Sequence, residues 1–418
     1  MKKKYFKRIV KIKDLGEIIT GTRPPTKQNK YFEGEYYFIK PSDIAEGQRY
    51  ITETEMTLSD DGCEYQKRKL LPKNSICIVC IGTIGKMCLT SKYSFTNQQL
   101  NSIIVDQNKY NPIYLYYLMR MCIPLVKQLN AGSASGRENV NKSSFENIEI
   151  EVHELSVQRK IASVLSTYDD LIENNTRRIE ILEEMARSLY NEWFVKFRFP
   201  GHKQTEMVDS ELGLIPEGWK VKKLGDIAAI NRFNIKTSHA PEEINYIDIA
   251  SVSTGIINKI ESLAFADAPS RARRTVKHGD IIWSTVRPNR RSYSLILNPQ
   301  PYLIVSTGFA VISTEEVPYT YLYQALTTDD FVGYLTNNAT GSAYPAVNSG
   351  NFNNANILLP ETQLLTKFNN IVEAILLKKQ NLQRKNENLR KTRDLLLPKL
   401  ISGEIDVENI DINKEELY

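Results

Sequence analysis

Apolar residues recur at alternating spacings of four and three in two stretches of the chain, which is the pattern of a coiled-coil seam. The first stretch runs from Ile161 to Trp193, and the second begins 207 residues after the first, at Phe368. Each stretch predicts a helix of about 40 residues, roughly 60 Å long at 1.5 Å per residue. The apolar seam positions are Ile161, Leu165, Ile172, Ile179, Leu182, Leu189, Phe368, Val372, Ile375, Leu382, Leu389 and Leu396.

The second seam is less apolar than the first, because Lys379, Asn386 and Arg393 fall on it. Polar residues at such positions usually fix the register and the partner of a helix at some cost in stability. A helix with a single apolar stripe must bury that stripe, and the economical partner is the other helix of the same chain. We therefore expect the two helices to pair antiparallel, with two unrelated core helices as the alternative. Phe199-Pro200-Gly201 should end the first helix, and Pro398 the second.

A repeat with nearly the same period extends beyond the helices. The motif Leu15-Gly16-Glu17-Ile18 returns as Leu224-Gly225-Asp226-Ile227, and Gly132-Ser133-Ala134 returns as Gly341-Ser342-Ala343, with offsets of 224 − 15 = 209 and 341 − 132 = 209. Each copy places a strand-leaning globular region before a long helix. We predict an α+β protein with two mixed, strand-rich domains separated by two long antiparallel coiled-coil helices in a pseudo-two-fold repeat. The expected boundaries are 1–153, a central helix at 154–198, 199–363 with a linker at 199–219, and a distal helix with its tail at 364–418.

Composition places the chain among globular proteins, since 41% of its 418 residues are hydrophobic and 25% are charged. It contains no run of 18 apolar residues, and its lysine-rich start lacks the apolar segment of a signal peptide, so we expect no membrane contact and a cytoplasmic location. All five cysteines lie in the first third. Cys77 and Cys80 have C-x-x-C spacing, but in a strand they face opposite sides of the sheet. This favours buried thiols over a zinc site.

Charge is distributed unevenly along the chain. Lysine plus arginine minus aspartate plus glutamate gives 23 − 16 = +7 for residues 1–153, but 14 − 16 = −2 for residues 199–363. The second region nevertheless gathers seven basic residues between Arg271 and Arg291, with Asp280 as the only acid among them. Such a cluster is typical of a loop that binds phosphates and reads guanine edges, although arginines paired with acids elsewhere in the fold would also explain it.

The residues expected to contact DNA combine basic side chains with turns rich in glycine, serine and asparagine, which allow close approach to a sugar-phosphate backbone. In the first region they are Thr22, Arg23, Lys40, Lys67, Arg68, Lys69, Lys86, Arg137 and Asn141. In the second region they are Arg232, Arg271, Arg273, Arg274, Arg287, Asn289, Arg290, Arg291, Tyr344 and Asn348.

Motifs for chemistry are incomplete. Residues 82–86 resemble part of a phosphate loop, but the spacing of G-x-x-x-x-G-K-[ST] fails and Met87 replaces the hydroxyl residue. Residues 111–114 lack the second proline of the N-P-P-Y signature of DNA amino-methyltransferases, and they predict a helix start with Asn111 as the cap. We therefore expect no catalytic residue, no metal and no cofactor bound by this chain.

Several motifs, taken in their order along the whole chain, resemble the specificity subunits of type I restriction-modification enzymes. They are the Leu-Gly-Glu-Ile motif at 15–18, Gly-Thr-Ile-Gly-Lys at 82–86, Asn-Gln-Gln-Leu at 97–100, the turn at 132–141, Gln-Arg-Lys-Ile-Ala at 158–162, Ile-Pro-Glu-Gly-Trp at 215–219, and residues 396–405.

The resemblance implies two target-recognition domains that each read one half of a bipartite, asymmetric site in double-stranded DNA. It also implies a helix pair that sets the unread gap and docks two methyltransferase (modification) subunits, which bring S-adenosylmethionine. Motor-nuclease (restriction) subunits would add ATP and magnesium chemistry. The second half lacks a full counterpart of residues 82–86, and residues 283–287 occupy roughly that place, so the domains should read different sequences. The alternatives are a coiled-coil adaptor without DNA binding, and a stand-alone methyltransferase or nuclease, which the missing cofactor loop disfavours.

Overall fold

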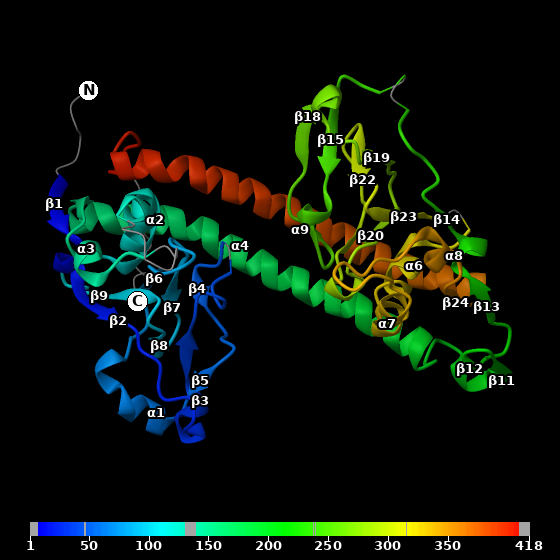
Figure 1. Ribbon diagram of the computed structural model, residues 1–418, viewed down its shortest axis with the longest axis horizontal. Helices are drawn as coiled ribbons and strands as arrows, with labels where there is room; N and C mark the ends of the chain where they lie inside the picture. The colour runs from blue at the N-terminus through cyan, green and yellow to red at the C-terminus, as the bar shows by residue number, and fades with distance from the viewer. Residues whose placement is uncertain are drawn as a thin grey trace. The chain divides into compact units, whose positions relative to one another are not determined.

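The computed structural model describes residues 7–45, 47–129, 139–236, 238, 240–314 and 316–408. The chain forms two compact units, with Met1–Asn174 and Asn386–Tyr418 in the first and Asn175–Lys385 in the second. The division passes through both long helices, α4 (Leu155–Tyr190) and α9 (Thr362–Ser402). Each unit therefore contains half of each long helix, together with its own sheets (Figure 1).

The described residues of the first unit form three sheets. The largest is five-stranded and has the order β2 (Gly16–Thr20), β9 (Leu100–Val105), β6 (Ile76–Val79), β7 (Met87–Thr90) and β4 (Tyr50–Ile51). The second has the order β5 (Thr57–Leu58), β3 (Phe32–Ile39) and β8 (Ser94–Thr96). Finally, β1 (Lys7–Lys11) pairs with β10 (Glu149–His153). Its helices besides α4 and α9 are α1 (Asp60–Tyr65), α2 (Pro112–Gln128) and α3 (Lys142–Glu146).

The second unit repeats this strand order. Its main sheet is β14 (Ala229–Ile230), β23 (Phe309–Ser313), β20 (Ile281–Ser284) and β21 (Tyr293–Leu295), and its second sheet is β18 (Glu261–Ala264), β15 (Glu243–Ile247), β22 (Leu303–Ser306) and β19 (Ala272–Thr275). Its described residues also form two-stranded pairs: β13 (Lys220–Lys223) with β24 (Asn356–Leu359), β16 (Val252–Ser253) with β17 (Ile256–Ile257), and β11 (Met207–Ser210) with β12 (Gly213–Pro216). The remaining helices are α5 (Leu224–Ile227), α6 (Tyr319–Ala325), α7 (Asp329–Asn337) and α8 (Ser349–Asn353).

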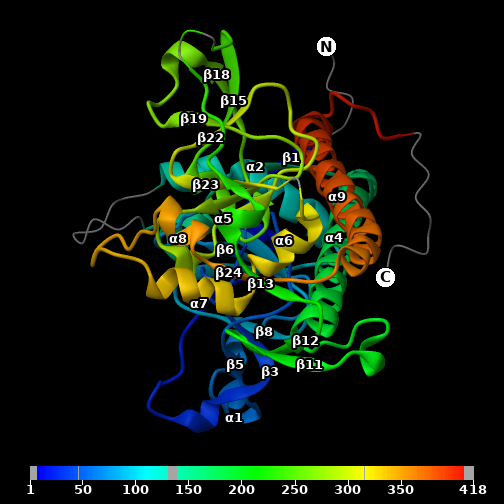
Figure 2. The ribbon, with the colours of Figure 1, turned by 90° about the vertical axis from the view of Figure 1, so that its right-hand side faces the viewer.

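The correspondence includes strand direction. The antiparallel order β2-β9-β6-β7 matches β14-β23-β20-β21, and the parallel pair β3 and β8 matches β15 and β22. Figures 1 and 2 both show β15 and β18 side by side as a ribbon in the second unit. The α+β class and the internal repeat predicted from the sequence are confirmed.

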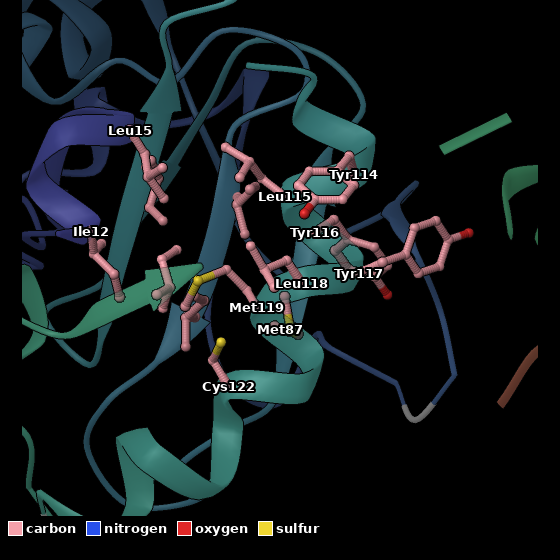
Figure 3. Close-up of a cluster of buried hydrophobic side chains, with 14 of the residues drawn as sticks. Ile12, Leu15, Met87, Tyr114, Leu115, Tyr116, Tyr117, Leu118, Met119 and Cys122 are labelled. Carbon is pink, nitrogen blue, oxygen red and sulfur yellow. The ribbon is translucent and has the colours of Figure 1, made fainter. Parts of the chain in front are cut away.

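The core of the first unit lies between the five-stranded sheet and α2. Figure 3 shows the buried side chains that α2 contributes, among them Leu115, Leu118 and Met119. Strand alternation divides β6 between two clusters, because Ile76, Ile78 and then Cys80 face the α2 side, while Cys77 and Val79 face the other side. Cys77 and Cys80 therefore lie on opposite faces of the sheet, as predicted. All five cysteines are free thiols, and the described part of the chain contains no cluster suited to hold a metal ion.

Within each unit, α4 and α9 pack against each other antiparallel, as predicted. In the first unit, Asp169 of α4 contacts Arg393 of α9, whereas Asn386 lies next to Ile172. In the second unit, Glu183 pairs with Lys379, and the ring of Tyr190 lies 6.3 Å from that of Phe368. Of the apolar seam positions, Ile161, Leu165, Ile172, Phe368, Val372 and Leu382 are buried, and Ile179, Leu182, Leu189, Ile375, Leu389 and Leu396 are half-buried.

The three polar seam residues of α9 are also buried, with exposed fractions of 7% for Lys379, 2% for Asn386 and 3% for Arg393. Each one has a partner on α4: the Glu183 carboxylate, the carbonyl oxygen of Ile172 at 3.3 Å from Asn386 Nδ2, and the Asp169 carboxylate. A buried polar group without a partner is costly, so these contacts favour one register of the helix pair over its neighbours.

The prediction that Pro398 ends the second helix is wrong. Pro398 lies inside α9, which continues to Ser402. Because proline has no backbone N–H, one backbone hydrogen bond is missing from the last turns of the helix. Leu400 and Ile401, which follow Pro398, are nevertheless buried in the core of the first unit. The α-helical part of the first helix ends at Tyr190, earlier than expected, and a π-helical turn at Asn191–Val195 follows it. Gly201, at the predicted end, has a left-handed φ of 96°. Among the described residues, no helix is long and apolar enough to cross a membrane.

Candidate nucleic-acid interface

Part of the arginine cluster of the second unit meets in a loop between β20 and β21. The loop contains a single 3-10 turn, η9 (Pro288–Arg290), between two residues with left-handed backbones, Arg287 at φ 51° and Arg291 at φ 54°. The Arg287 guanidinium donates to the carbonyl oxygen of Ala343 at 3.2 Å and lies 4.6 Å from the ring centroid of Tyr344. Tertiary contacts therefore join the arginine loop to the small-residue turn that follows α7.

The other candidate arginines of this unit, Arg232, Arg271, Arg273 and Arg274, lie outside this loop. Arg271 is exposed, whereas Arg273 lies 5.2 Å from the ring centroid of Phe265 and donates to the Ala272 carbonyl at 2.8 Å. Arg274 is half-buried, and burial lowers the pKa of its guanidinium. Arg232, on another segment, lies 5.1 Å from the ring centroid of Phe233. The packing of Arg273 and Arg274 shows that part of the cluster contributes to the fold itself.

The candidate residues of the first unit are mostly exposed and are partly paired with acids. Thr22 donates to Gln66 Oε1 at 3.0 Å, which places the 22–23 turn beside the 67–69 segment. Lys40 forms an ion pair with Glu55, and hydrogen bonding to Lys40 lowers the pKa of that exposed carboxyl. Arg23 lies 3.6 Å from the Met56 sulfur, and Lys67 pairs with Glu64 at 3.1 Å. Arg68 is exposed, Lys69 is half-buried, and Arg137 lies outside the described residues.

Lys86 has a defined structural task in the turn between β6 and β7. Its ammonium group donates to the carbonyl oxygens of Pro41 at 3.3 Å and Ile44 at 3.1 Å. Gly82 and Gly85 take left-handed φ values of 87° and 99° in the same turn. The lysine thus holds a neighbouring loop in place, a role that the motif at 82–86 did not reveal.

Asn141 and Asn348 occupy equivalent positions and play the same structural role in both units. Asn141 caps α3 by accepting from the Ser144 N–H at 2.8 Å, and Asn348 caps α8 by accepting from Gly350 at 2.8 Å and Asn351 at 3.2 Å. The sequence signal was available, because an asparagine before a short helical segment is a favoured N-cap. The side-chain oxygens of both asparagines are therefore engaged in helix capping.

Two units share one topology, and each carries exposed basic side chains on loops and a segment of both long helices, so the chain is a duplicated α+β protein. A family model described as the type I restriction modification DNA specificity domain matches the chain twice, at residues 6–184 and 216–385. The chain belongs to this family, so the resemblance seen in its motifs is confirmed.

Similar proteins agree with this assignment. The type I restriction enzyme MjaIX specificity subunit of Methanocaldococcus jannaschii is 28% identical over 415 residues, covering 96% of this chain and 94% of that protein. The HindI specificity subunit of Haemophilus influenzae is 38% identical over 187 residues, which cover 43% of this chain and 40% of that protein. In fold, the crystal structure of an S subunit from M. genitalium is similar over 95% of this chain and 96% of its own, with a TM-score of 0.61 at 18% identity.

Proposed function

We propose that this chain is the non-catalytic specificity subunit of a type I restriction-modification complex, and that each unit reads one half of a bipartite, asymmetric DNA site. The supporting observation is the combination of a shared strand order with unlike loops. Where the first unit has the turn between β6 and β7 with Lys86, the second has the arginine loop between β20 and β21. A common scaffold with different loops suits two readers that recognise different bases.

The chemistry of the complex is assigned to partner subunits in this proposal. Two methyltransferase subunits would bind S-adenosylmethionine, and motor-nuclease subunits would use ATP and magnesium. The two motifs of this chain nearest to cofactor or adenine sites are engaged internally, because Lys86 binds backbone carbonyls and the Asn111 side chain caps α2 by accepting from the Tyr114 N–H at 2.9 Å. The complex would work in the cytoplasm, where its DNA is found.

The helix pair would set the gap between the half-sites and would dock the methyltransferases. This part of the proposal rests on the repeat, since each unit contains equivalent antiparallel segments of α4 and α9. The buried polar contacts on the seam would keep the register, and so the length of the gap, constant.

The test is methylation of a DNA library by the chain assembled with its methyltransferase subunits. Both half-sites and the length of the gap are randomised, and methylated molecules are sequenced. We expect two short defined blocks of bases separated by one preferred gap. A complex that assembles but methylates without base preference, or fails to bind DNA at all, would contradict the proposal and favour an adaptor function.

A further inference from the structure

The arginine loop of the second unit is strained at both ends of its single turn. Arg287 and Arg291 have left-handed backbones although neither is glycine. A side chain makes this conformation unfavourable, and backbone strain of this kind persists only where surrounding contacts enforce it. The contacts that enforce it here can be identified for each end of the loop.

Arg287 is held by the turn at residues 340–346. Its backbone N–H donates to the Pro345 carbonyl at 2.7 Å, in addition to the side-chain contacts with Ala343 and Tyr344. That turn is itself well defined, because Thr340 and Ala346 exchange two backbone hydrogen bonds of 2.9 Å. The guanidinium of Arg287 is thus used to fasten one loop to another.

Arg291 is held by α7. Its guanidinium forms an ion pair with Asp329 in the first turn of that helix, and its backbone N–H donates to the Pro288 carbonyl at 3.0 Å. Pro288 is buried, so its packing also helps to hold the turn in place. Both ends of the loop therefore have contacts with neighbouring segments, and these contacts restrain the conformations open to its middle.

The middle of the loop has two exposed residues whose side chains do not hold the loop in place. Asn289 and Arg290 are exposed, and neither side chain has a hydrogen bond or ion pair with any described residue. Tyr344, whose ring packs on the guanidinium of Arg287, is 69% exposed. Arginine and asparagine are the residues that bind guanine and adenine edges with two hydrogen bonds each. A rigid loop loses less conformational entropy when such side chains bind.

We infer that Asn289 and Arg290 read bases in the half-site of the second unit, and that Arg287 and Arg291 are positioning residues that hold them. This inference rests on the proposed function and adds a division of labour within the basic cluster. Unlike Arg287 and Arg291, Arg290 has a guanidinium without a hydrogen bond or ion pair to any described residue. Arg287 and Arg291 act on recognition through the loop backbone.

The experiment measures base preference in the complete complex with the methyltransferase subunits, by competition among library sites. Arg290→Lys keeps the charge but removes the planar fork, and it should lower the preference at one or two base pairs of one half-site by about 5- to 150-fold. Preference in the other half-site should stay unchanged. Lys220→Ala removes an exposed cation from β13 of the same unit and should change no preference.

Arg287→Gly tests the positioning role, since glycine adopts the left-handed backbone but cannot hold the neighbouring turn. It should reduce preference at the same base pairs as Arg290→Lys, and adding Arg290→Lys to it should have little further effect. Effects that simply multiply would overturn the positioning role. A wild-type complex that reads two blocks, with an Arg290→Lys variant that keeps every preference, would overturn the reading role alone. A wild-type complex without any base preference would instead refute the proposed function.

Discussion

Replacing Arg393 by leucine (Arg393→Leu) should open the helix pair of the first unit, because it leaves the Asp169 carboxylate buried without its counter-charge. Both side chains are only 3% exposed, and the other Asp169 oxygen accepts from the Tyr117 hydroxyl. Breaking one side of a buried ion pair costs about 3–5 kcal/mol, since the remaining charge keeps its desolvation penalty. At 1.36 kcal/mol per factor of ten, the open population should rise roughly 150- to 5,000-fold.

Hydrogen exchange resolved along the chain is the suitable assay, because two units joined by continuous helices need not unfold in one step. Amides in α4 before Asn174 and in α9 after Asn386 should exchange faster in the variant. Adding Asp169→Asn should restore most of the protection, since asparagine carries no charge and its oxygen can still accept from Tyr117. The matched comparison is Lys379→Met in the second unit, where the partner Glu183 is 34% exposed and solvent screening should limit the loss to about 1 kcal/mol.

The reasoning would be refuted by an Arg393→Leu variant whose exchange in these segments rises less than tenfold. It would also fail if Asp169→Asn made the variant worse, because the loss would then come from packing rather than from an uncompensated charge.

Three further predictions concern the length of the helix pair, the N-cap of α8 and a buried histidine. Inserting one heptad into α4 and one at the facing position of α9 lengthens the helix pair by about 10 Å, which should lengthen the preferred gap by roughly three base pairs in library methylation. An unchanged gap would contradict the proposal that the helix pair sets it. Asn348→Ala should cost about 1 kcal/mol of local stability by removing the α8 cap, and Asn348→Ser should cost much less, as measured by hydrogen exchange of amides in the second unit. Burial lowers the pKa of His153 to about 4, below its ordinary value of 6.5. The unfolded chain therefore binds more protons between these values, so the first unit should lose stability as the pH falls from 6.5 to 4. His153→Gln should flatten that dependence in urea unfolding followed by a probe attached to the first unit.

The sequence by itself determined the features that depend on local periodicity. The 3.5-residue spacing located both helices and placed Lys379, Asn386 and Arg393 on the seam, where they are buried. The two-residue alternation of a strand separated Cys77 from Cys80. The matched offsets along the chain revealed the duplication, because a repeat requires no knowledge of contacts. These patterns are visible in one dimension.

Tertiary structure decided the contacts between residues distant in sequence. Arg393 contacts Asp169, 224 positions away in the sequence, and Arg287 contacts Ala343, 56 positions away. The contact of Arg287 distinguishes it from the exposed Arg290, although the cluster looks uniform in the sequence. Packing also carried α9 through Pro398, since burial of the residues beyond it outweighs one missing hydrogen bond. Partner choice depends on how the chain folds back on itself, and that information lies in no single segment.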